Sequence, residues 1–518
     1  SNQDYLQLSS LMELQLPFFP FFVTLLLFLI LIVKHGKNSK SRGPVPKLPP
    51  GPWKLPLIGN LHQLATGLPH HTLRDLAKKH GGIMHLKLGE VSAIVISSPE
   101  AAKEVMKTHD LVIADRPQLL AAKIMAYNST NIIFAPYGDY WRQLRKICVL
   151  ELLSARRVHS FKSIREEEAK KLIESITLSS GQPVNLSEKI MSLSYGFTSR
   201  AAFGQKCKDQ DEFVTVVKEA LMLSGGFDFP DLFPSLTFLH AISRVKSALE
   251  GIHRKVDKIL DDIINDHAVK WKSATTSSCR SGEEDLVDVL LKLQDSSDLE
   301  IPITTNNIKA VILDIFTAGS DTSFATIEWA MSEMIRTPKV MKKAQAEVRL
   351  ILKGKSGIEE TDFLELTYLK LVIKETLRLH PPAPLLVPRE ARERCEVNGY
   401  EVPIKTKVII NGWAIGRDPA YWTNADSFEP ERFYESSVDF KGTDFQFIPF
   451  GAGRRMCPGM LFGIANIELL LAQLLYHFDW KLAEGTKPEE LDMTEAFGAT
   501  VRRKNDLHLI GIPFIPLK

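Results

Sequence analysis

Apolar residues occur in three kinds of run along the chain, and each kind predicts a different element. From Leu14 to Val33 the run contains no charge, and about 20 helical residues at roughly 1.5 Å each match the roughly 30 Å hydrocarbon core of a bilayer. From Ile83 to Ser97 apolar and polar residues alternate around Gly89-Glu90, as in a β-hairpin. From about Phe161 to Leu350 the apolar residues recur with a helical period. The pattern therefore predicts a membrane helix, a small sheet and a helical middle.

Charge distribution gives the first run an orientation. Two acidic residues precede it and four basic residues follow it, which is the reverse of the order in a cleaved signal peptide. The positive-inside rule then places everything after Val33 in the cytosol. We expect a short lumenal tail at 1–13, a transmembrane anchor at 14–33, a basic and proline-rich linker at 34–60 and a cytosolic domain at 61–518. Because Met12 opens a natural-looking start, we interpret residues 1–11 as an extension and exclude them from fold reasoning.

Local signals complete the predicted fold. Ser98-Pro99-Glu100 offers an N-cap, a first-turn proline and a first-turn acid, and so predicts that a helix begins there. Strand-like runs return at 395–411 and 507–514, so sheet elements from both ends of the sequence should meet in space. The serine-rich stretch 273–282 reads as a surface loop. The expected fold is one large, mainly helical α+β unit.

Composition removes several classes of function. Lys and Arg number 64 against 62 Asp and Glu, so the net charge of +2 gives no sign of a nucleic-acid-binding surface. Five cysteines, an odd number without CxxC spacing, argue against a disulfide scaffold and favour a reducing compartment. Two sequons, at Asn128 and Asn185, are interpreted as chance occurrences.

One cysteine lies in an unusual loop, FGAGRRMCPG from Phe450 to Gly459, which precedes a helical pattern. The glycines permit positive φ or a close approach to a flat ligand. Backbone N–H groups and the helix N-terminus should lower the pKa of the thiol, so that a thiolate can bind iron. A buried structural cysteine and a dinucleotide loop are the alternatives, but Met456 stands where the third glycine of a dinucleotide loop belongs. We find no nicotinamide or flavin motif, so electrons must come from another protein.

The order Phe450-x-x-Gly453-x-Arg455-x-Cys457-x-Gly459 resembles the heme-binding signature of the cytochrome P450 family. The resemblance implies the cytochrome P450 fold, heme b as cofactor and Cys457 as the metal ligand. It also implies that Phe450, Gly453 and Arg455 bind the cofactor, with Arg455 meeting a propionate. A thiolate opposite oxygen favours cleavage of the O–O bond.

The stretch from Thr305 to Thr337 predicts a helix of about thirty residues that crosses the domain and ends before Pro338. A threonine inside a helix usually only bonds back to the carbonyl one turn earlier. Here the segment 318–323 resembles the oxygen-binding motif of the family, which implies that Thr322 and Asp321 relay protons. Asp314 shares a face with Thr322. We interpret Asp314 as a structural partner of another residue rather than as a substrate contact, because an unpaired acid in an apolar pocket is costly.

Charged residues elsewhere match further family positions. Glu375 and Arg378, followed by Arg432, resemble a buried Glu-Arg-Arg triad that stabilises the core. Trp141 and Arg145 lie at i and i+4, so both could reach one propionate, and Arg389 matches another propionate contact of the family. The alternative is a basic surface helix. Nearby basic residues could dock an acidic reductase surface, namely Arg142, Lys146, Arg156 and Arg157.

Together the motifs imply a monooxygenase that uses O2 and electrons from NADPH-cytochrome P450 reductase, anchored in the endoplasmic reticulum membrane with its catalytic domain in the cytosol. Longer stretches of the sequence are similar to plant microsomal members of the cytochrome P450 family, above all to sesquiterpenoid, monoterpenoid and diterpenoid oxygenases. The family's substrate-facing segments are largely apolar here, which favours a hydrophobic terpenoid. They fall at about 113–134, 213–239, 310–322, 383–387 and 497–501. The alternatives are an alkaloid or phenolic substrate, an O2-independent isomerase or dehydratase, and a non-catalytic heme-binding membrane protein.

Overall fold

The structure is a computed structural model. It describes residues 47–65, 67–205, 210–225, 228–236, 243–274, 284–296, 299–353, 360–482 and 486–514. The predicted membrane helix at 14–33 and most of the predicted linker lie outside these residues. So does nearly all of the predicted loop at 273–282.

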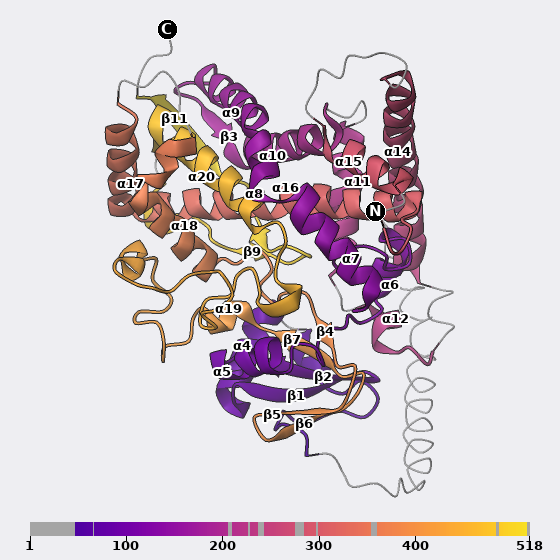
Figure 1. The fold of residues 1–518 in the computed structure, drawn as a ribbon. Helices are drawn as coiled ribbons and strands as arrows, with labels where there is room; N and C mark the ends of the chain where they lie inside the picture. Colours follow the sequence, from indigo (N-terminus) through magenta and orange to yellow (C-terminus); the bar gives the residue numbers. More distant parts are fainter. Residues whose placement is uncertain are drawn as a thin grey trace, which may run out of the picture.

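Helices account for most of the described chain (Figure 1). The α-helices are α3 (Leu61–Leu64), α4 (Pro69–His80), α5 (Pro99–Lys103), α6 (Leu120–Met125), α7 (Asp139–Ile147), α8 (Ala155–Ser160), α9 (Lys162–Thr177), α10 (Leu186–Phe203), α11 (Gln210–Leu223), α12 (Phe229–Leu232), α14 (Arg244–Ala274), α15 (Leu286–Asp295), α16 (Thr305–Arg336), α17 (Pro338–Ile351), α18 (Thr367–Leu379), α19 (Gly412–Ile415) and α20 (Met460–His477). Shorter turns are the π-helices η1 (Glu104–Thr108) and η2 (Cys148–Leu152) and the 3-10 helices η3 (Glu360–Leu364), η4 (Pro430–Phe433), η5 (Gly453–Arg455) and η6 (Pro488–Glu490).

Strands form small sheets at the edges of the helical body. They are β1 (Ile83–Leu88), β2 (Val91–Ile96), β3 (Pro183–Asn185), β4 (Arg389–Glu390), β5 (Cys395–Val397), β6 (Tyr400–Val402), β7 (Lys407–Ile410), β8 (Phe478–Lys481), β9 (Glu495–Ala496), β10 (Arg502–Arg503) and β11 (His508–Pro513). The largest sheet has the order β1-β2-β7-β4, and β2 pairs with β7 in parallel. In Figure 1 this sheet lies at the bottom of the molecule. The other sheets are β3-β11-β8, β5-β6 and β10-β9.

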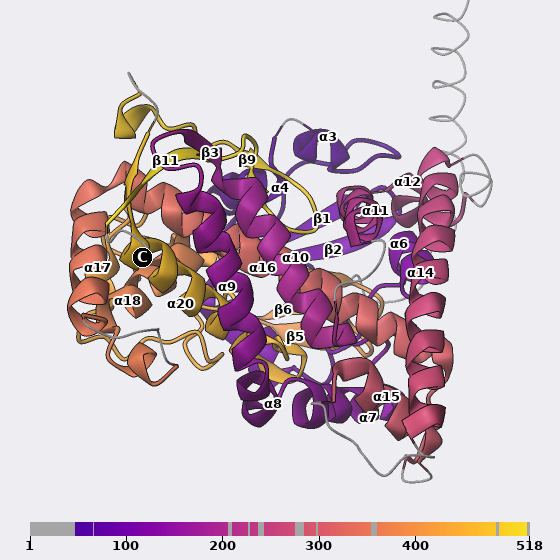
Figure 2. The same ribbon diagram turned by 90° about the horizontal axis from the view of Figure 1, so that it is seen from above.

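The long helix α16 runs through the middle of the molecule (Figures 1 and 2). It begins with a capping box, in which the Thr304 and Asn307 side chains each accept from the other residue's backbone N–H. Most of its residues are buried, because α10, α15, α18 and α20 pack around it. One large apolar cluster contains residues of its first half, Ile308 to Phe316, and another contains residues of its second half, Phe324 to Ile335, so the helix joins the two parts of the core.

The predicted elements are confirmed where the structure describes them. The hairpin pairs Ile83 with Ile96, and the Ser98 side chain accepts from the Ala101 N–H at the start of α5. The strand run at 395–411 meets the hairpin through β7. The C-terminal run 508–513 instead pairs with β3, a short strand that the helical pattern of the middle concealed. Among the described helices, Met460–His477 has the length and apolarity of a membrane span, but half of its most apolar window is buried in the core.

Candidate functional site

The loop from Phe450 to Gly459 is shaped by its glycines and by its contact with η1. The Cys457 N–H donates to the carbonyl of Phe450 at 3.0 Å, which closes the loop. Gly453 has φ of +67°, and a Cβ there would lie 2.2 Å from the carbonyl oxygen of Met106. Of the two roles expected for this glycine, the positive φ is confirmed, and the backbone of η1 leaves no room for a side chain there. Asp110 stabilises the contact between the loop and the segment after η1, because its carboxylate accepts from the Arg454 N–H at 2.8 Å.

Cys457 lies at the end of this loop, three residues before α20. Its side chain keeps exposed surface although the residue is surrounded by protein atoms. Burial raises the pKa of the Cys457 thiol above its ordinary value, while the Gly459 N–H and the charge of Arg145 act to lower it. The prediction of a lowered pKa is therefore wrong for the protein alone. The backbone donors and the helix start do not offset desolvation, so a stable thiolate needs a bound cation.

A close crossing of α16 and α20 brings the predicted oxygen-binding segment towards this loop. A Cβ on Gly319 would lie 3.2 Å from the Phe462 ring, and one on Gly463 would lie 3.7 Å from Ser323 Oγ. Glycine at these positions lets the two helices approach. Most of α16 is buried, but the stretch beside the crossing is accessible. Ala318 is exposed there, and Thr317, Gly319 and Thr322 are partly exposed.

Thr322 lies on that side and is partly exposed. Its Oγ1 donates to the carbonyl of Ala318 at 2.6 Å, the ordinary back-bond of a helical threonine. The hydroxyl oxygen keeps its lone pairs as acceptors. Its predicted part in a proton relay stays a prediction.

Asp321 lies about 100° around the helix from Thr322, and only Asp321 lines the neighbouring cavity. It is 6% exposed, and burial raises its pKa to about 6, with Arg502 and Lys218 acting in the opposite direction. The carboxyl group lies at a cavity between α11, α16 and the β9–β10 turn. The residues that line this cavity are Lys218, Leu221, Met222, Asp321, Ala496, Phe497, Gly498, Ala499, Thr500 and Arg502. Asp321 therefore lies where the buried helix α16 meets a cavity that is lined by two basic side chains, Lys218 and Arg502.

Four arginines gather beside the cysteine loop. Arg455 and Arg389 are buried and electrostatically coupled, and Arg145 acts on Arg455 as well. Burial lowers the pKa of Arg455 to about 9, with Arg389 as the next cause. Arg116, also buried, has its pKa held well below its ordinary value by burial and then by Arg455 and Arg389. Such a concentration of buried positive charge is costly unless anions neutralise it.

The acids next to these arginines are too few to balance them. Asp110 accepts from Arg389 at 2.7 Å, and Asp115 acts on Arg116 and Arg455. Since Asp110 also lies 3.8 Å from Arg454, these carboxylates leave positive charge in excess among the described residues. In addition, Arg455 Nη1 is buried and has no hydrogen-bond partner in the described part of the chain. This donor set fits a ligand with two carboxylates, such as the two propionates of heme.

The predicted propionate ligands are thus brought together, although Trp141, Arg389 and Arg455 already have hydrogen-bond partners, which for Arg455 are the carbonyls of Ala114 and Ala135. The Trp141 indole N–H donates to the carbonyl of Ile132 at 3.0 Å, and the Arg455 guanidinium lies 4.2 Å from the Trp141 ring centroid. Arg389 bonds Asp110 and the carbonyl of Ala452. Arg145 is half-buried near Cys457. Their contacts with a propionate stay predictions.

Sequence reasoning missed Arg116 and its acidic neighbours. Arg116 donates from Nε to the carbonyl of Ile133 at 2.9 Å and from Nη1 to the carbonyl of Pro388 at 2.8 Å. The segment 111–116 has no regular periodicity, so no helix or strand pattern marked it. A charged pair, Asp115-Arg116, inside a largely apolar stretch is the signal that could have indicated a buried site.

The Glu-Arg-Arg triad forms as predicted. Both carboxylate oxygens of Glu375 accept from Arg378 at 2.7 Å, and Arg432 Nε donates to Oε1 at 2.8 Å. Glu375 is fully buried. The guanidinium groups also bond carbonyls of the segment 416–427, so the triad ties α18 to the irregular chain that leads into the cysteine loop.

Asp314 has a structural partner, as predicted. Its carboxylate accepts from Asn131 Nδ2 at 2.7 Å and from two backbone N–H groups of the segment before α7. Burial raises its pKa to about 7, and these hydrogen bonds act in the opposite direction.

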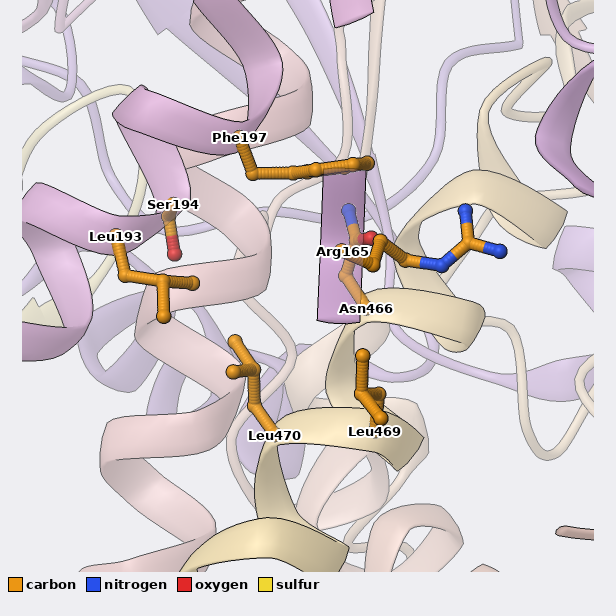
Figure 3. A pocket seen from close by; sticks show the side chains of 7 residues that line it. All are labelled: Arg165, Leu193, Ser194, Phe197, Asn466, Leu469 and Leu470. Atoms are coloured by element: carbon orange, nitrogen blue, oxygen red, sulfur yellow. The ribbon is translucent and has the colours of Figure 1, made fainter. Parts of the chain in front are cut away.

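A second cavity lies between α9, α10 and α20 (Figure 3). Its lining residues are Arg165, Leu193, Ser194, Phe197, Asn466, Leu469 and Leu470. None of the predicted site residues faces it. The cavity is small and mainly apolar, and so it belongs to the core rather than to the site.

Solved structures share this fold. A zebrafish cytochrome P450 with progesterone has a TM-score of 0.73 and aligns over 86% of this chain and 100% of its own, at 23% identity. A second zebrafish cytochrome P450 structure, with abiraterone, has a TM-score of 0.72. The fold is therefore that of the cytochromes P450.

The sequence comparisons agree and are more specific. The family model described as Cytochrome P450 matches residues 49–510. Desmethyl-deoxy-podophyllotoxin synthase of Sinopodophyllum hexandrum is 58% identical over 94% of this chain and 95% of its own. Premnaspirodiene oxygenase of Hyoscyamus muticus is 54% identical over 95% and 98%, and melianol synthase of Ailanthus altissima is 55% identical over 97% of both chains. The chain belongs to the cytochrome P450 family. It is a plant monooxygenase of the 71 group, in a family whose cofactor is a heme held by a cysteine thiolate.

Proposed function

We propose that this protein oxygenates a hydrophobic plant metabolite, most suitably a terpenoid, with Cys457 as the ligand of heme iron. The observation that supports the site best is the convergence of Cys457 with four arginines whose positive charge exceeds that of the neighbouring acids. Arg116, Arg145, Arg389 and Arg455 would hold the propionates, and Trp141 would pack beneath Arg455. When bound, the heme supplies the oxidising chemistry.

The chain's own residues would position the substrate and deliver protons. Thr322 Oγ1 lies on the exposed side of α16 and would accept and pass on a proton. Asp321 contacts the cavity with Lys218 and Arg502 and would take protons from solvent there. Because Asp321 and Thr322 are sequence neighbours on different sides of the helix, the pair would connect the solvent side with the reacting side.

The substrate class is supported by the apolar segments of the site and by relatives. Premnaspirodiene oxygenase and melianol synthase align over nearly the whole chain. The relative named desmethyl-deoxy-podophyllotoxin synthase, which is 58% identical, favours a phenolic compound as the second candidate.

We propose an endoplasmic reticulum anchor at 14–33 and NADPH-cytochrome P450 reductase as electron donor. The predicted docking face begins at α7, where Arg142 and Lys146 are exposed. Exposed basic side chains suit a transient contact with an acidic partner.

Microsomes that contain the protein and the reductase should be supplied with NADPH, labelled dioxygen and panels of terpenes and phenolic lignan precursors. We expect one oxygen label in a terpene product. A labelled product from the phenolic panel alone would assign the second class. NADPH consumption without any oxygenated product would contradict the monooxygenase proposal for both classes.

Replacing Thr322 by alanine should uncouple electron use from product formation. Without the hydroxyl, proton delivery loses its last donor, so the product formed per NADPH should fall at least about tenfold. Thr326→Ala is the matched control, because Thr326 makes the same back-bond one turn later, to the Thr322 carbonyl at 2.9 Å, and is buried. Equal losses in both variants would show that the effect is structural.

Activity should depend on pH through Asp321. Its pKa of about 6 means that the group holds its proton below about pH 6 and releases it above that pH. Because the relay donates from the protonated form, we expect product formation to decline as pH rises from 5.5 to 7.5, centred near the pKa of about 6. In Asp321→Asn the profile should be flat and the rate low. Rates are normalised to cytochrome c reduction by the reductase at each pH, and an unchanged profile would contradict the role.

A further inference from the structure

Two adjacent histidines of α4 converge on one carboxylate from the far end of the chain. His70 Nε2 lies 2.7 Å and His71 Nε2 lies 3.0 Å from the same oxygen, Oε2 of Glu495 in β9. The two nitrogens and this carboxylate lie within 4.8 Å of one another. None of the three residues belongs to the cysteine loop or to the arginine cluster beside it, so the heme site does not account for their convergence.

Hydrogen bonding satisfies only one of the two imidazoles. The contact between His70 and Glu495 is a hydrogen bond, and His70 is fully buried. His71 Nε2 is enclosed by protein, and among the described residues it has no hydrogen-bond partner, although the carboxylate oxygen lies 3.0 Å away. Enclosing a ring nitrogen without a partner is costly. A cation bound between the nitrogens and the oxygen would use the lone pair of His71.

The protonation states of the buried ligands suit a metal ion. Burial lowers the pKa of His70 below its ordinary value, although the contact with Glu495 acts in the opposite direction, so this imidazole is neutral at neutral pH. Burial acts to raise the pKa of the Glu495 carboxyl, but the contacts with the two histidines outweigh it and hold that pKa far below its usual range. Metal ions bind carboxylates and neutral imidazoles, which are the states found here.

Trp413 of α19 fixes the orientation of both rings. It stacks on His71 with the ring centroids 4.2 Å apart, and it meets the edge of the His70 ring at 5.1 Å. The two imidazoles are perpendicular to each other, with their centroids 4.5 Å apart. Side chains that packing already holds in place lose little conformational freedom when they bind a ligand.

His71 gives the cluster a side that faces solvent. Its side chain is 39% exposed, whereas those of His70 and Glu495 are 0% and 9% exposed. An ion can therefore enter beside His71, and water can complete its coordination there. Three protein ligands with one open position for water are an established coordination set for Zn²⁺.

Neighbouring arginines limit the affinity for any cation. Arg417 and Arg74 lie over the Trp413 ring at 4.0 Å and 4.8 Å, and the charge of Arg417 acts on His70 and Glu495. His70 Nδ1 also has no acceptor in the described part of the chain, so the outer hydrogen bond that usually supports a ligating histidine is missing. The attraction must come from the imidazole nitrogens, which favours Zn²⁺ over Ca²⁺ and Mg²⁺.

We propose that His70, His71 and Glu495 form a binding site for one zinc ion, separate from the heme site. The ion would join α4 to β9, the first strand of a hairpin in which Glu495 pairs with Arg503 of β10. The turn of this hairpin lines the cavity at Asp321. Zinc would therefore stabilise the hairpin and, through it, one wall of that cavity.

The test titrates zinc chloride into the purified holoenzyme, prepared without a polyhistidine tag, by isothermal titration calorimetry near neutral pH. We expect one ion per chain and a dissociation constant on the order of 10 μM, since a missing outer hydrogen bond alone costs about 10–100-fold in affinity. In His71→Ala the affinity should fall at least about tenfold, because one of three protein ligands is lost. Calcium chloride should give no saturable heat.

His508→Ala is the matched control, because it removes an exposed histidine of β11 from outside the cluster. It should bind zinc as the wild-type does. Glu495→Gln, which keeps the volume of the buried ligand, should weaken zinc binding as His71→Ala does. The reduced, carbon monoxide-bound spectrum verifies that each variant is folded with heme. Zinc should raise the melting temperature of the wild-type and of His508→Ala, but not that of His71→Ala.

Two results would overturn the inference. If His71→Ala bound zinc with the affinity and stoichiometry of the wild-type, the ion would lie at other side chains, and the cluster would be a contact between α4 and β9 only. The absence of saturable heat with the wild-type up to about 1 mM zinc would equally exclude a specific site. Conversely, crystals soaked in zinc should show an anomalous diffraction peak between the three side chains.

Discussion

Replacing Cys457 by alanine is expected to abolish the spectrum of a thiolate-ligated heme and all oxygenase activity. The sulfur lies at the end of the glycine loop with exposed surface, close enough to Arg145 for their charges to interact. Neither of the other described thiols can replace it. Cys148 is buried and burial raises its pKa to about 12, while Cys395 belongs to β5. The measurement is the reduced, carbon monoxide-bound difference spectrum, together with product formation.

Cys395→Ala is the matched control for this experiment, because it removes a partly exposed thiol from outside the site. It should retain the thiolate spectrum and the activity. If Cys457→Ala still showed the spectrum of a thiolate-ligated heme, the assignment of Cys457 as the iron ligand would be wrong. A heme spectrum with altered ligation and no turnover is the expected result, because the arginines still hold the propionates.

Replacing Glu375 by glutamine should have the second-largest effect, on folding and heme retention. Glu375 is fully buried and receives hydrogen bonds from Arg378 and Arg432 at 2.7–2.8 Å. Glutamine keeps the volume but leaves the buried Arg378 guanidinium without its counter-charge and removes the nearer of the two carboxylates that pair with Arg432. Removing one partner of a buried ionic group costs about 3–5 kcal/mol. We therefore expect a loss of about that size in the free energy of unfolding, measured by chemical denaturation, and a lower heme content per chain.

The control variant here is Glu429→Gln. Glu429 pairs with the same Arg432 at 3.6 Å, but its side chain is 47% exposed, so the pair is screened by solvent. We expect a change of about 0–1 kcal/mol and normal heme content. If the two variants destabilised the protein equally, the buried triad would have no special part in the fold.

Periodicity and capping were sufficient to predict the regular elements near the site. Helix α16 runs from Thr305 to Arg336, close to the predicted bounds, because its cap residues and Pro338 are local signals. The hairpin of β1 and β2 and the helix after the cysteine loop follow from equally local patterns. The short strand β3 was missed, since three residues carry too little periodicity to stand out from the helices around them.

The predicted site residues show where local reasoning ends. Arg389 and Arg145 come from segments far from the loop that carries Cys457 and Arg455, and their convergence with it was expected only from the family resemblance. Asp321 and Thr322 are neighbours in sequence, but the structure places the acid at a charged cavity that the partly exposed Thr322 does not line. The direction of the Cys457 pKa was predicted wrongly, because desolvation depends on every atom around the thiol and not on the loop alone.

The sequence by itself determined the fold class, the family and the cysteine loop, because these depend on spacing, periodicity and residue type along one segment. Only the tertiary structure decided which acidic side chain lies next to which donor or basic side chain. It paired Asp314 with residues 131–133 and Asp110 with Arg389, and it left the arginines beside Cys457 with an excess of positive charge. Burial and charge balance are sums over segments distant in the chain, and so they exist only once the chain is folded.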